Sequence, residues 1–362
     1  MRSPHPRRFI AVPFLVAMAL LAGCARDNTA QAGNPAPTAA AAVREEPVRI
    51  TNGDITLAGT LVIPPGSAPR PAVVLFHGSG PQARDLYTAR WFAGQGIVAL
   101  AYDKRGVGES TGDFRKGPFM DLCDDGLAAI AYVKSRKEVD PKRIGVWGLS
   151  QGGWLGPLAA SRSTDVAWVI AVSGPGVSPG EQMIVYYAND LRAKGGSDKD
   201  VEEATALRRE VWTYLETGKG YEKAKADRDQ ARSSPWYKEV KAQQDDLFGS
   251  LPTPAQLSDP AFPWARWFRR EAIYDPVPAL EALHVPALFL FGDQDQLIPV
   301  AKSVEVIRQV QAQGDHHDFT IKVFPGVDHG MYQTAGSGAG DISSGYLTAM
   351  RAWLAAHAMG AR

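Results

Sequence analysis

The stretch WGLSQGG, from Trp147 to Gly153, decides the fold. The apolar run that starts at Arg143 leads into it and the segment WLGPLAAS follows it, which indicates a strand, a sharp turn and then a helix. Ser150 stands on the turn between Gly148 and Gly152, and small residues at these two positions let the backbone fold tightly. This pattern, G-x-S-x-G, is typical of a nucleophile elbow, in which a serine hydroxyl is held beside the N-terminus of a helix.

The same pattern also occurs as GESTG from Gly108 to Gly112, so the motif alone does not identify a nucleophile. Seven residues separate Ser110 from the preceding apolar run, and the following segment TGDFRKGP contains two glycines and a proline, so a helix cannot begin there. We therefore interpret Ser110 as a loop residue lining the site and Ser150 as the nucleophile. Pro157 conflicts with a regular helix after Ser150, because a proline beyond the first turn interrupts a helix.

An activated serine needs a histidine base and a carboxylate that orients it. Of the seven histidines, His329 has the expected position, because it follows the strand-like run IKVF in the last loop before the C-terminal helix-like segment. The segment FGDQDQLIP, after the apolar run ALFLF, offers Asp293 and Asp295 as the acid. Asp328 is a poor orienter, because adjacent side chains usually point apart. The resulting order of serine, aspartate and histidine is one that hydrolase sites use.

The negative charge of a tetrahedral intermediate needs N–H donors. The first is expected from the backbone of Gln151, the residue after the nucleophile. The second is expected from the loop HGSG, residues 77–80, where the N–H of Ser79 or of its neighbour would donate and Gly78 would let the backbone approach the substrate. We interpret His77 in this loop as a structural residue rather than a base.

Outside these motifs, the chain alternates between short apolar runs and helix-like segments. The turn signal Asn52-Gly53 joins two β-rich runs between Val48 and Ile63. Buried parallel strands are expected at residues 72–76, 97–102, 143–147, 168–172, 287–291 and 319–324. Helices are expected at residues 86–94, 119–135, 153–161, 300–313 and 343–358. The alternation predicts an α/β fold with a mostly parallel sheet flanked by helices and an N-terminal hairpin at its edge.

Residues 179–280 break the alternation. They are charged and helix-like, yet they contain many aromatic residues, which need a surface to bury against. We interpret the region as a helical cap inserted into a catalytic core formed by residues 46–178 and 281–362. Trp264 and Trp267 of this cap are candidates for an apolar substrate pocket, and a buried structural role fits their sequence context equally well.

The N-terminus has the pattern of a targeting signal. Arginines precede an apolar run from Phe9 to Leu21, which is too short to span a bilayer. The run ends in LAGC and resembles a bacterial lipobox, so residues 1–23 are expected to form a lipoprotein signal peptide and Cys24 to carry the lipid. An ordinary signal peptide with a chance cysteine is the alternative. Residues 24–45 are expected to form a flexible tether that links the core to the lipid, at the periplasmic face of the outer membrane in the bacterial cell envelope.

Composition narrows the class of protein further. The 39 basic and 39 acidic side chains balance, so the charge gives no sign of nucleic-acid binding. The chain has two cysteines, and a lipid on Cys24 leaves Cys123 as a lone thiol, so no intrachain disulfide is expected.

Five motifs together resemble the α/β-hydrolase superfamily. They are HGSGP at 77–81, YDKRGVGES at 102–110, GLSQGG at 148–153, GDQDQLIP at 292–299 and PGVDHGM at 325–331. The sequence looks most like bacterial esterases with a helical cap, near the dienelactone-hydrolase and serine-aminopeptidase-like branches. The resemblance implies Ser150 as nucleophile, His329 as base and Asp295 as acid, with Asp293 as the alternative acid. It implies no metal and no cofactor.

One motif departs from the related sequences. The segment after HGSGP often reads QDRD in them, whereas it is Gln82-Ala83-Arg84-Asp85 here. The change at Ala83 leaves the roles of Arg84 and Asp85 open, and it does not affect the three triad residues.

The expected activity is that of a carboxylesterase that cleaves a small-molecule ester through an acyl-enzyme on Ser150. A serine peptidase that removes N-terminal residues is an alternative, and it would need cap carboxylates to hold a free amine. The candidates are Glu202, Glu203, Glu210, Glu216 and Glu271. Thioester hydrolysis is a closer variant, and a binding lipoprotein that keeps only the hydrolase fold is an alternative from another class.

Overall fold

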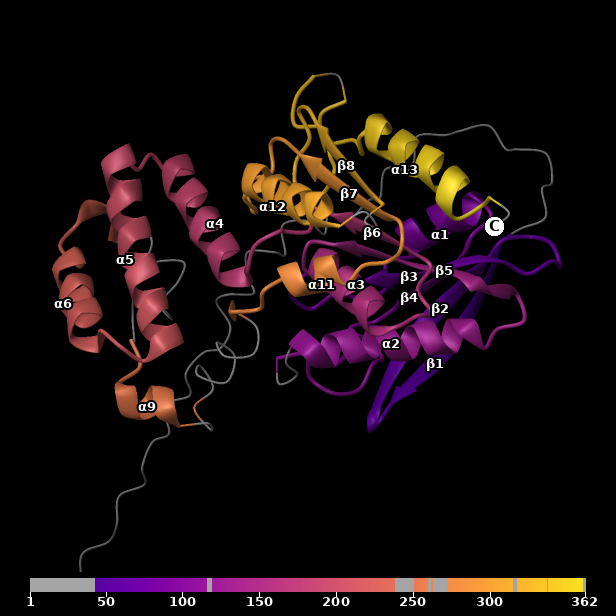
Figure 1. The fold of residues 1–362 in the computed structure, drawn as a ribbon, viewed down its shortest axis with the longest axis horizontal. Coiled ribbons are helices and arrows are strands. Elements are labelled where there is room, and N and C mark those ends of the chain that lie inside the picture. The colour runs from indigo at the N-terminus through magenta and orange to yellow at the C-terminus, as the bar shows by residue number, and fades with distance from the viewer. Residues whose placement is uncertain are drawn as a thin grey trace, which may run out of the picture.

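The chain folds around one eight-stranded sheet, shown in Figure 1 as a computed structural model. The structure describes residues 43–115, 119–237, 251–259, 262, 272–314, 318–336 and 338–360. The strands are β1 (Arg44–Asn52), β2 (Ile55–Ile63), β3 (Arg70–Phe76), β4 (Val98–Tyr102), β5 (Val139–Leu149), β6 (Trp168–Val172), β7 (Ala287–Gly292) and β8 (Phe319–Phe324). Their order across the sheet is β1-β2-β4-β3-β5-β6-β7-β8.

The N-terminal hairpin forms one edge of the sheet, as the sequence predicts. Strands β1 and β2 pair antiparallel, with Asn52 opposite Ile55, and β2 pairs antiparallel with β4. Gly53 lies in the two-residue turn with φ of +56°, a left-handed conformation that glycine adopts without steric cost. The strands from β4 to β8 are parallel to one another, so their carboxyl ends meet at one edge of the sheet.

Helices cover both faces of the sheet. Those that pack on it are α1 (Leu86–Gly94), α2 (Phe119–Lys134), α3 (Gln151–Arg162), α11 (Val277–Glu281), α12 (Val300–Gln313) and α13 (Ser344–His357). Apolar side chains of α1 and α13 share one hydrophobic cluster with the sheet, and those of α2, α3, α11 and α12 share a second cluster. The predicted α/β architecture is confirmed. Because both faces are covered, the strands β4, β6 and β7 are buried throughout, which accounts for their continuous apolar sequences.

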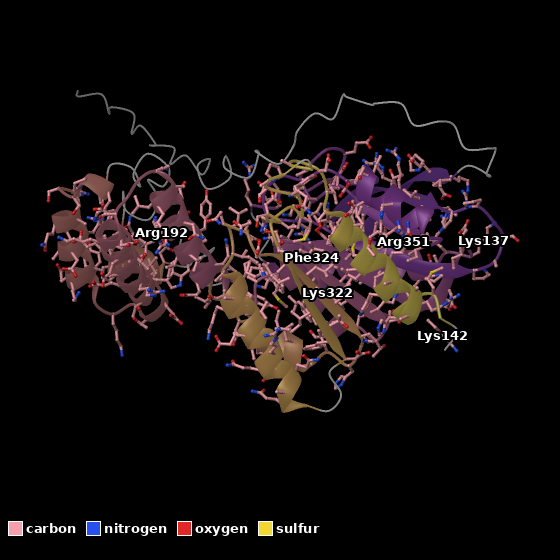
Figure 2. The ribbon with its side chains drawn as sticks, turned by 90° about the horizontal axis from the view of Figure 1, so that it is seen from above. Lys137, Lys142, Arg192, Lys322, Phe324 and Arg351 are labelled. Carbon is pink, nitrogen blue, oxygen red and sulfur yellow. The ribbon has the colours of Figure 1, made fainter. Side chains whose placement is uncertain are left out.

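A helical insertion lies between β6 and β7. Its described helices are α4 (Pro179–Ala193), α5 (Asp198–Thr217), α6 (Tyr221–Ala231) and α9 (Pro254–Ser258), and they have a hydrophobic cluster of their own. Both views place the insertion at one side of the sheet; in Figure 2, Arg192 of α4 lies on it, whereas Lys322 of β8 and Arg351 of α13 lie on the core. That this insertion acts as a cap over the active site stays a prediction.

The chain rejoins the core earlier than the sequence suggests. Ala279 and Leu280 of α11 are buried in the cluster shared with α3 and α12, so the core resumes before residue 281, the expected boundary. Trp264 and Trp267, the expected pocket residues, lie outside the described residues. Among the described helices, none combines the length and the apolar character needed to cross a bilayer. Cys123 is buried and free, and burial raises the pKa of its thiol to about 11.

Candidate active site

Ser150 occupies the sharp turn between β5 and α3 in a conformation that few serines adopt. Its φ is +57° and its ψ is −113°, a left-handed backbone conformation that costs about 1–3 kcal/mol in a non-glycine residue. The turn is held by the N–H of Ser150, which donates to the carbonyl of Val172 at the end of β6 at 2.9 Å. Strain retained by the surrounding structure is typical of functional sites, and here it presents the serine at the carboxyl edge of the sheet.

The glycines around Ser150 are required by close backbone approach. A Cβ on Gly148 would lie 2.2 Å from the carbonyl oxygen of Gly152, and a Cβ on Gly152 would lie 2.6 Å from that of Phe76. A Cβ on Gly153 would lie 2.3 Å from the Cα of Gly174. Without side chains, these glycines fit at the start of helix α3. The helix begins at Gln151, two residues before the expected start, and it continues through Pro157.

His329 and Asp295 form a buried hydrogen-bonded pair. The Nδ1 atom of His329 lies 2.7 Å from Oδ2 of Asp295, and both side chains are almost completely buried. A carboxylate can only accept here, so the proton of the neutral ring stands on Nδ1 and the lone pair on Nε2. Nε2 is buried and makes no hydrogen bond within the described part of the chain. This is the tautomer that a general base for a serine hydroxyl needs.

The other carboxylate oxygen of Asp295 is also fixed. Oδ1 accepts hydrogen bonds from the backbone N–H groups of Leu297 at 2.8 Å and Ile298 at 3.2 Å. By contrast, the exposed Asp293 accepts from the N–H of Gly326 at 2.7 Å and serves the neighbouring turn. The structure thus brings Asp295, and not Asp293, against the histidine.

The loop that carries His329 is anchored to β6. Ser173, which follows β6 with φ of +47°, donates a hydrogen bond from its buried hydroxyl to the carbonyl of His329 at 2.8 Å. Asp328 accepts from the N–H groups of Gly330 and Tyr332, both at 2.9 Å, and so stabilises the turn without contacting the ring. Since Ser150 is bonded to Val172 and His329 to Ser173, the end of β6 aligns both loops.

Two backbone N–H groups have positions suited to an oxyanion. Gln151 is buried and is the first residue of α3, so its N–H lies at the positive end of the helix. In the HGSG loop, the N–H of Gly78 donates to the side chain of Gln82 at 2.8 Å, whereas that of Ser79 makes no hydrogen bond to any described residue. Ser79, rather than Gly78, therefore has the N–H that remains for a ligand.

His77 has a structural environment, as the sequence suggests. Its Nε2 lies 2.5 Å from the carbonyl of Tyr102, to which it donates, and its ring packs edge-on against the Tyr102 ring. Burial, with the charge of Lys104 nearby, lowers the pKa of His77 to about 3. The ring is therefore neutral at pH 7, and Nε2 is not available as a base.

Charged residues of the segment Gln82-Ala83-Arg84-Asp85 and of the motif YDKRGVGES stabilise loops. The guanidinium of Arg84 pairs with Asp103 at 2.6 Å and with Glu109 at 2.8 Å, and Asp85 caps α1 by accepting from the N–H of Thr88. The pairing with Arg84 helps to hold the pKa of Asp103 below its usual value, against the opposing effect of burial.

Lys104 is a site residue that sequence reasoning missed. It is 3% exposed, and its Nζ donates to the carbonyls of Gly78 at 2.8 Å and Gly80 at 3.1 Å and to the side-chain oxygen of Gln151 at 2.8 Å. The signals in the sequence are its place in the motif YDKRGVGES and its position two residues after a buried strand, near the edge where functional groups gather. In the described ranges, no group of three or more histidine, cysteine, aspartate or glutamate side chains is arranged to hold a metal ion.

The architecture and this site define an α/β-hydrolase, and comparison with known proteins agrees. The family model described as "Serine aminopeptidase, S33" matches residues 67–333, and the chain belongs to this family. The predicted superfamily is therefore confirmed.

Two sequence relatives match about a third of the chain. The esterase EstD of Thermotoga maritima is 36% identical over 130 residues, which cover 33% of this chain and 31% of that esterase. The quorum-quenching protein AidA of Acinetobacter baumannii is 32% identical over 129 residues, which cover 34% of this chain and 42% of AidA. The aligned segment thus spans less than half of either relative.

Two solved structures match most of the chain. The α/β hydrolase GrgF from Penicillium has a TM-score of 0.55 at 20% identity, covering 88% of this chain and 100% of GrgF. Est1E from Butyrivibrio proteoclasticus, solved with ferulic acid, also has a TM-score of 0.55, at 18% identity, covering 86% of this chain and 100% of Est1E. At these identities the likeness concerns the fold alone.

Proposed function

We propose that the protein is a serine hydrolase that cleaves carboxylic esters through an acyl-enzyme on Ser150. The observation that carries the proposal is the pair of His329 and Asp295, which fixes the proton on Nδ1 and leaves a buried Nε2 without a hydrogen bond to any described residue. The strained turn at Ser150 and the N–H groups of Gln151 and Ser79 supply the other parts that acyl transfer requires.

In the proposed mechanism, the oxygen of Ser150 attacks the ester carbonyl carbon while Nε2 of His329 takes the hydroxyl proton. The carbonyl π electrons move to oxygen, and the N–H groups of Gln151 and Ser79 stabilise that negative charge. The bond to the alcohol oxygen then breaks as His329 returns the proton to it, which leaves the acyl-enzyme. Water attacks in the same way and releases the acid. Asp295 keeps the ring oriented and stabilises its positive charge throughout.

An ester is proposed as the substrate over a peptide for two reasons. EstD, the relative with 36% identity, is named an esterase. An aminopeptidase would need carboxylates free to hold an α-amine, and two of the candidates on α5 are engaged within the insertion. Glu203 accepts from the indole N–H of Trp236 at 3.1 Å, and Glu210 pairs with Lys223 at 2.7 Å. The family is described as one of serine aminopeptidases, and acyl-coenzyme A thioesterases are among the relatives. Amide and thioester substrates are therefore tested as well.

Stopped-flow hydrolysis of p-nitrophenyl acetate and butyrate tests the proposal. Ser150→Ala is expected to lower kcat by roughly 10⁴-fold or more, because loss of the nucleophile alone removes most of the rate in this type of site. Ser110→Ala is the matched control, since it changes the serine of the GESTG pattern and should keep kcat within about threefold. Wild-type turnover by Ser150→Ala in a clean preparation would sink the proposal.

Two further assays separate the alternatives. Aminoacyl p-nitroanilides and acyl thioesters, compared with esters of matched acyl length, distinguish a peptidase or a thioesterase from an esterase by kcat/KM. Labelling with a fluorophosphonate probe, followed by peptide mass analysis, distinguishes an enzyme from a binding lipoprotein. The enzyme is modified on Ser150, and a protein that only binds stays unlabelled.

We also propose that a lipid on Cys24 anchors the protein in the bacterial cell envelope. The support is the lipobox-like run before Cys24, which lies outside the described residues. Cells that express wild type should show the protein in the membrane fraction and label it with radioactive palmitate. Cys24→Ser should abolish both, and Cys123→Ser, which removes the buried thiol, is the control that should keep both. Labelling that persists in Cys24→Ser would contradict the anchor.

A further inference from the structure

Lys104 connects the two segments that carry the proposed oxyanion donors. Its side chain donates to Gly78 and Gly80 of the HGSG loop and to the side chain of Gln151 on α3, at distances of 2.8–3.1 Å. Its backbone N–H also donates to the carbonyl of Gln82, at the far end of the same loop, at 3.1 Å. A single buried residue after β4 therefore holds the loop after β3 against the helix after β5.

The contact with Gly78 has a specific chemical consequence. The carbonyl of Gly78 and the N–H of Ser79 belong to one peptide group. A cation that binds the carbonyl oxygen draws electron density through this amide and strengthens the N–H as a donor, since hydrogen bonds in a chain polarise one another. The N–H of Gly78 is meanwhile held by Gln82, so the loop is fixed from both sides and the Ser79 N–H keeps its direction.

The charge of Lys104 also acts on the site as a whole. Three of the groups that accept from Nζ are uncharged, namely the carbonyls of Gly78 and Gly80 and the side-chain oxygen of Gln151. The side chain is 3% exposed, and a charge in such a low-dielectric position interacts with a nearby oxyanion far more strongly than it would in water. This attraction arises only when the substrate oxygen becomes negative, so it stabilises the transition state and not the bound substrate.

We propose that Lys104 is a positioning residue for the oxyanion hole, which polarises the Gly78–Ser79 peptide and locks it against Gln151. This inference rests on the proposed serine hydrolase function. It differs from a purely structural role in one measurable way. The loss of Lys104 should weaken binding of an oxyanion, and it should hardly change binding of the uncharged substrate.

Kinetics of Lys104→Met and Lys104→Gln on p-nitrophenyl acetate test the inference. For Lys104→Met, kcat should fall by about 10–100-fold while KM stays within about threefold, because removing a whole oxyanion donor costs about 100–1,000-fold and Lys104 acts through such a donor. Lys104→Gln keeps a neutral donor for Gly78 and should fall between wild type and Lys104→Met. Lys104→Arg, which keeps the charge, should recover part of the rate lost in Lys104→Met.

Affinity for a short alkyl trifluoromethyl ketone gives the second readout. The serine oxygen adds to the ketone carbon, the proton moves to His329 and the carbonyl π electrons move to oxygen, so the bound adduct is an oxyanion. The inhibition constant should rise by the same factor by which kcat falls. Lys134→Met is the matched control, because Lys134 is an exposed lysine at the end of α2, which leads to the opposite edge of the sheet, and both values should stay at wild type.

The outcomes separate the inference from the function on which it rests. A folded Lys104→Gln variant with wild-type kcat and wild-type ketone affinity overturns the role of Lys104, and so does an effect confined to KM. Thermal unfolding of each variant shows that it is folded at the assay temperature, and Lys104→Gln decides the matter if Lys104→Met does not fold. Absence of any Ser150-dependent turnover in wild type overturns the proposed function itself.

Discussion

Ser150 and Ser110 both stand at the centre of a G-x-S-x-G pattern, and the two serines have opposite environments. Ser150 has a left-handed backbone with φ of +57°, and its side chain makes no capping hydrogen bond to α3. Ser110 is 8% exposed, and its hydroxyl accepts from the N–H of Ala58 at 2.9 Å and donates to the carbonyl of Asp103 at 2.7 Å. It holds the loop after β4 to β2, where it does not have the free hydroxyl expected of a site-lining residue.

The difference shows that a short motif defines spacing and that the environment defines chemistry. At Ser150 the chain keeps a strained backbone conformation at the carboxyl edge of the sheet, which is typical of a functional site. At Ser110 the same residue type satisfies buried backbone groups and stabilises the fold.

The largest effect is expected at Asp295, the proposed acid of the catalytic triad. In Asp295→Asn, the amide no longer holds the proton on Nδ1 of His329, so kcat for p-nitrophenyl acetate should fall by about 10³–10⁴-fold. Asp293→Asn, two residues away in the same loop, is the control and should stay within about threefold of wild type, since the side chain of Asp293 accepts from Gly326 and Gln294 and not from His329 among the described residues. Equal losses in the two variants would contradict the assignment of the acid.

The second effect concerns stability at the other serine. Ser110→Ala leaves the N–H of Ala58 and the carbonyl of Asp103 without their partner, which should lower the free energy of unfolding by about 2 kcal/mol. Urea denaturation followed by circular dichroism measures this change, and kcat on p-nitrophenyl acetate should stay close to wild type. A large loss of kcat without loss of stability would show that Ser110 belongs to the active site.

The core could be predicted from the sequence because parallel strands that are covered on both faces are continuous apolar runs. Strand β4 reads VALAY and is buried throughout, and the expected run of 97–102 differs from it by one residue. The start of α3 was harder to predict. Gly152 and Gly153 weaken any helical pattern, and they are needed because backbone segments approach them closely.

Parts of the site could not be predicted in the same way. The choice between Asp293 and Asp295 depends on the backbone N–H groups of Leu297 and Ile298, which hold one carboxylate toward His329 and not the other. Lys104 looks like a surface lysine in a polar loop, since lysines are almost never fully buried. Its acceptors include main-chain oxygens, and no sequence pattern reports where these point.

A third prediction concerns His77, which joins the two regions because it stands in the oxyanion loop and donates to Tyr102, just before the Ser110 loop. Its pKa is lowered to about 3 by burial, whereas in the unfolded chain it is near 6.5. Between these values the unfolded state binds the proton and the folded state does not, so stability is complete above pH 6.5 and is lost as the pH falls.

At pH 5 the loss for this residue is about 2 kcal/mol. Urea denaturation of wild type and His77→Gln at pH 7.5 and pH 5 measures it, because the difference between the two proteins removes the contribution of other groups. Wild type should lose more stability than His77→Gln on acidification. An identical pH dependence in both proteins would show that His77 is protonated in the folded state.

The smallest effect tests the strain at Ser150 directly. Glycine adopts φ of +57° without steric cost, so Ser150→Gly should raise the free energy of unfolding by about 1 kcal/mol relative to Ser150→Ala, while both variants are inactive. The higher entropy of glycine in the unfolded chain opposes this gain and keeps it small.

Ser110→Gly relative to Ser110→Ala is the matching comparison at the GESTG motif. Ser110 does not have a positive φ, so glycine there brings only the entropic penalty and should lower stability. Opposite signs of the glycine-minus-alanine difference in the free energy of unfolding would mean that the backbone is strained at Ser150 and unstrained at Ser110. If both glycine variants are less stable than their alanine counterparts, the turn at Ser150 is not strained.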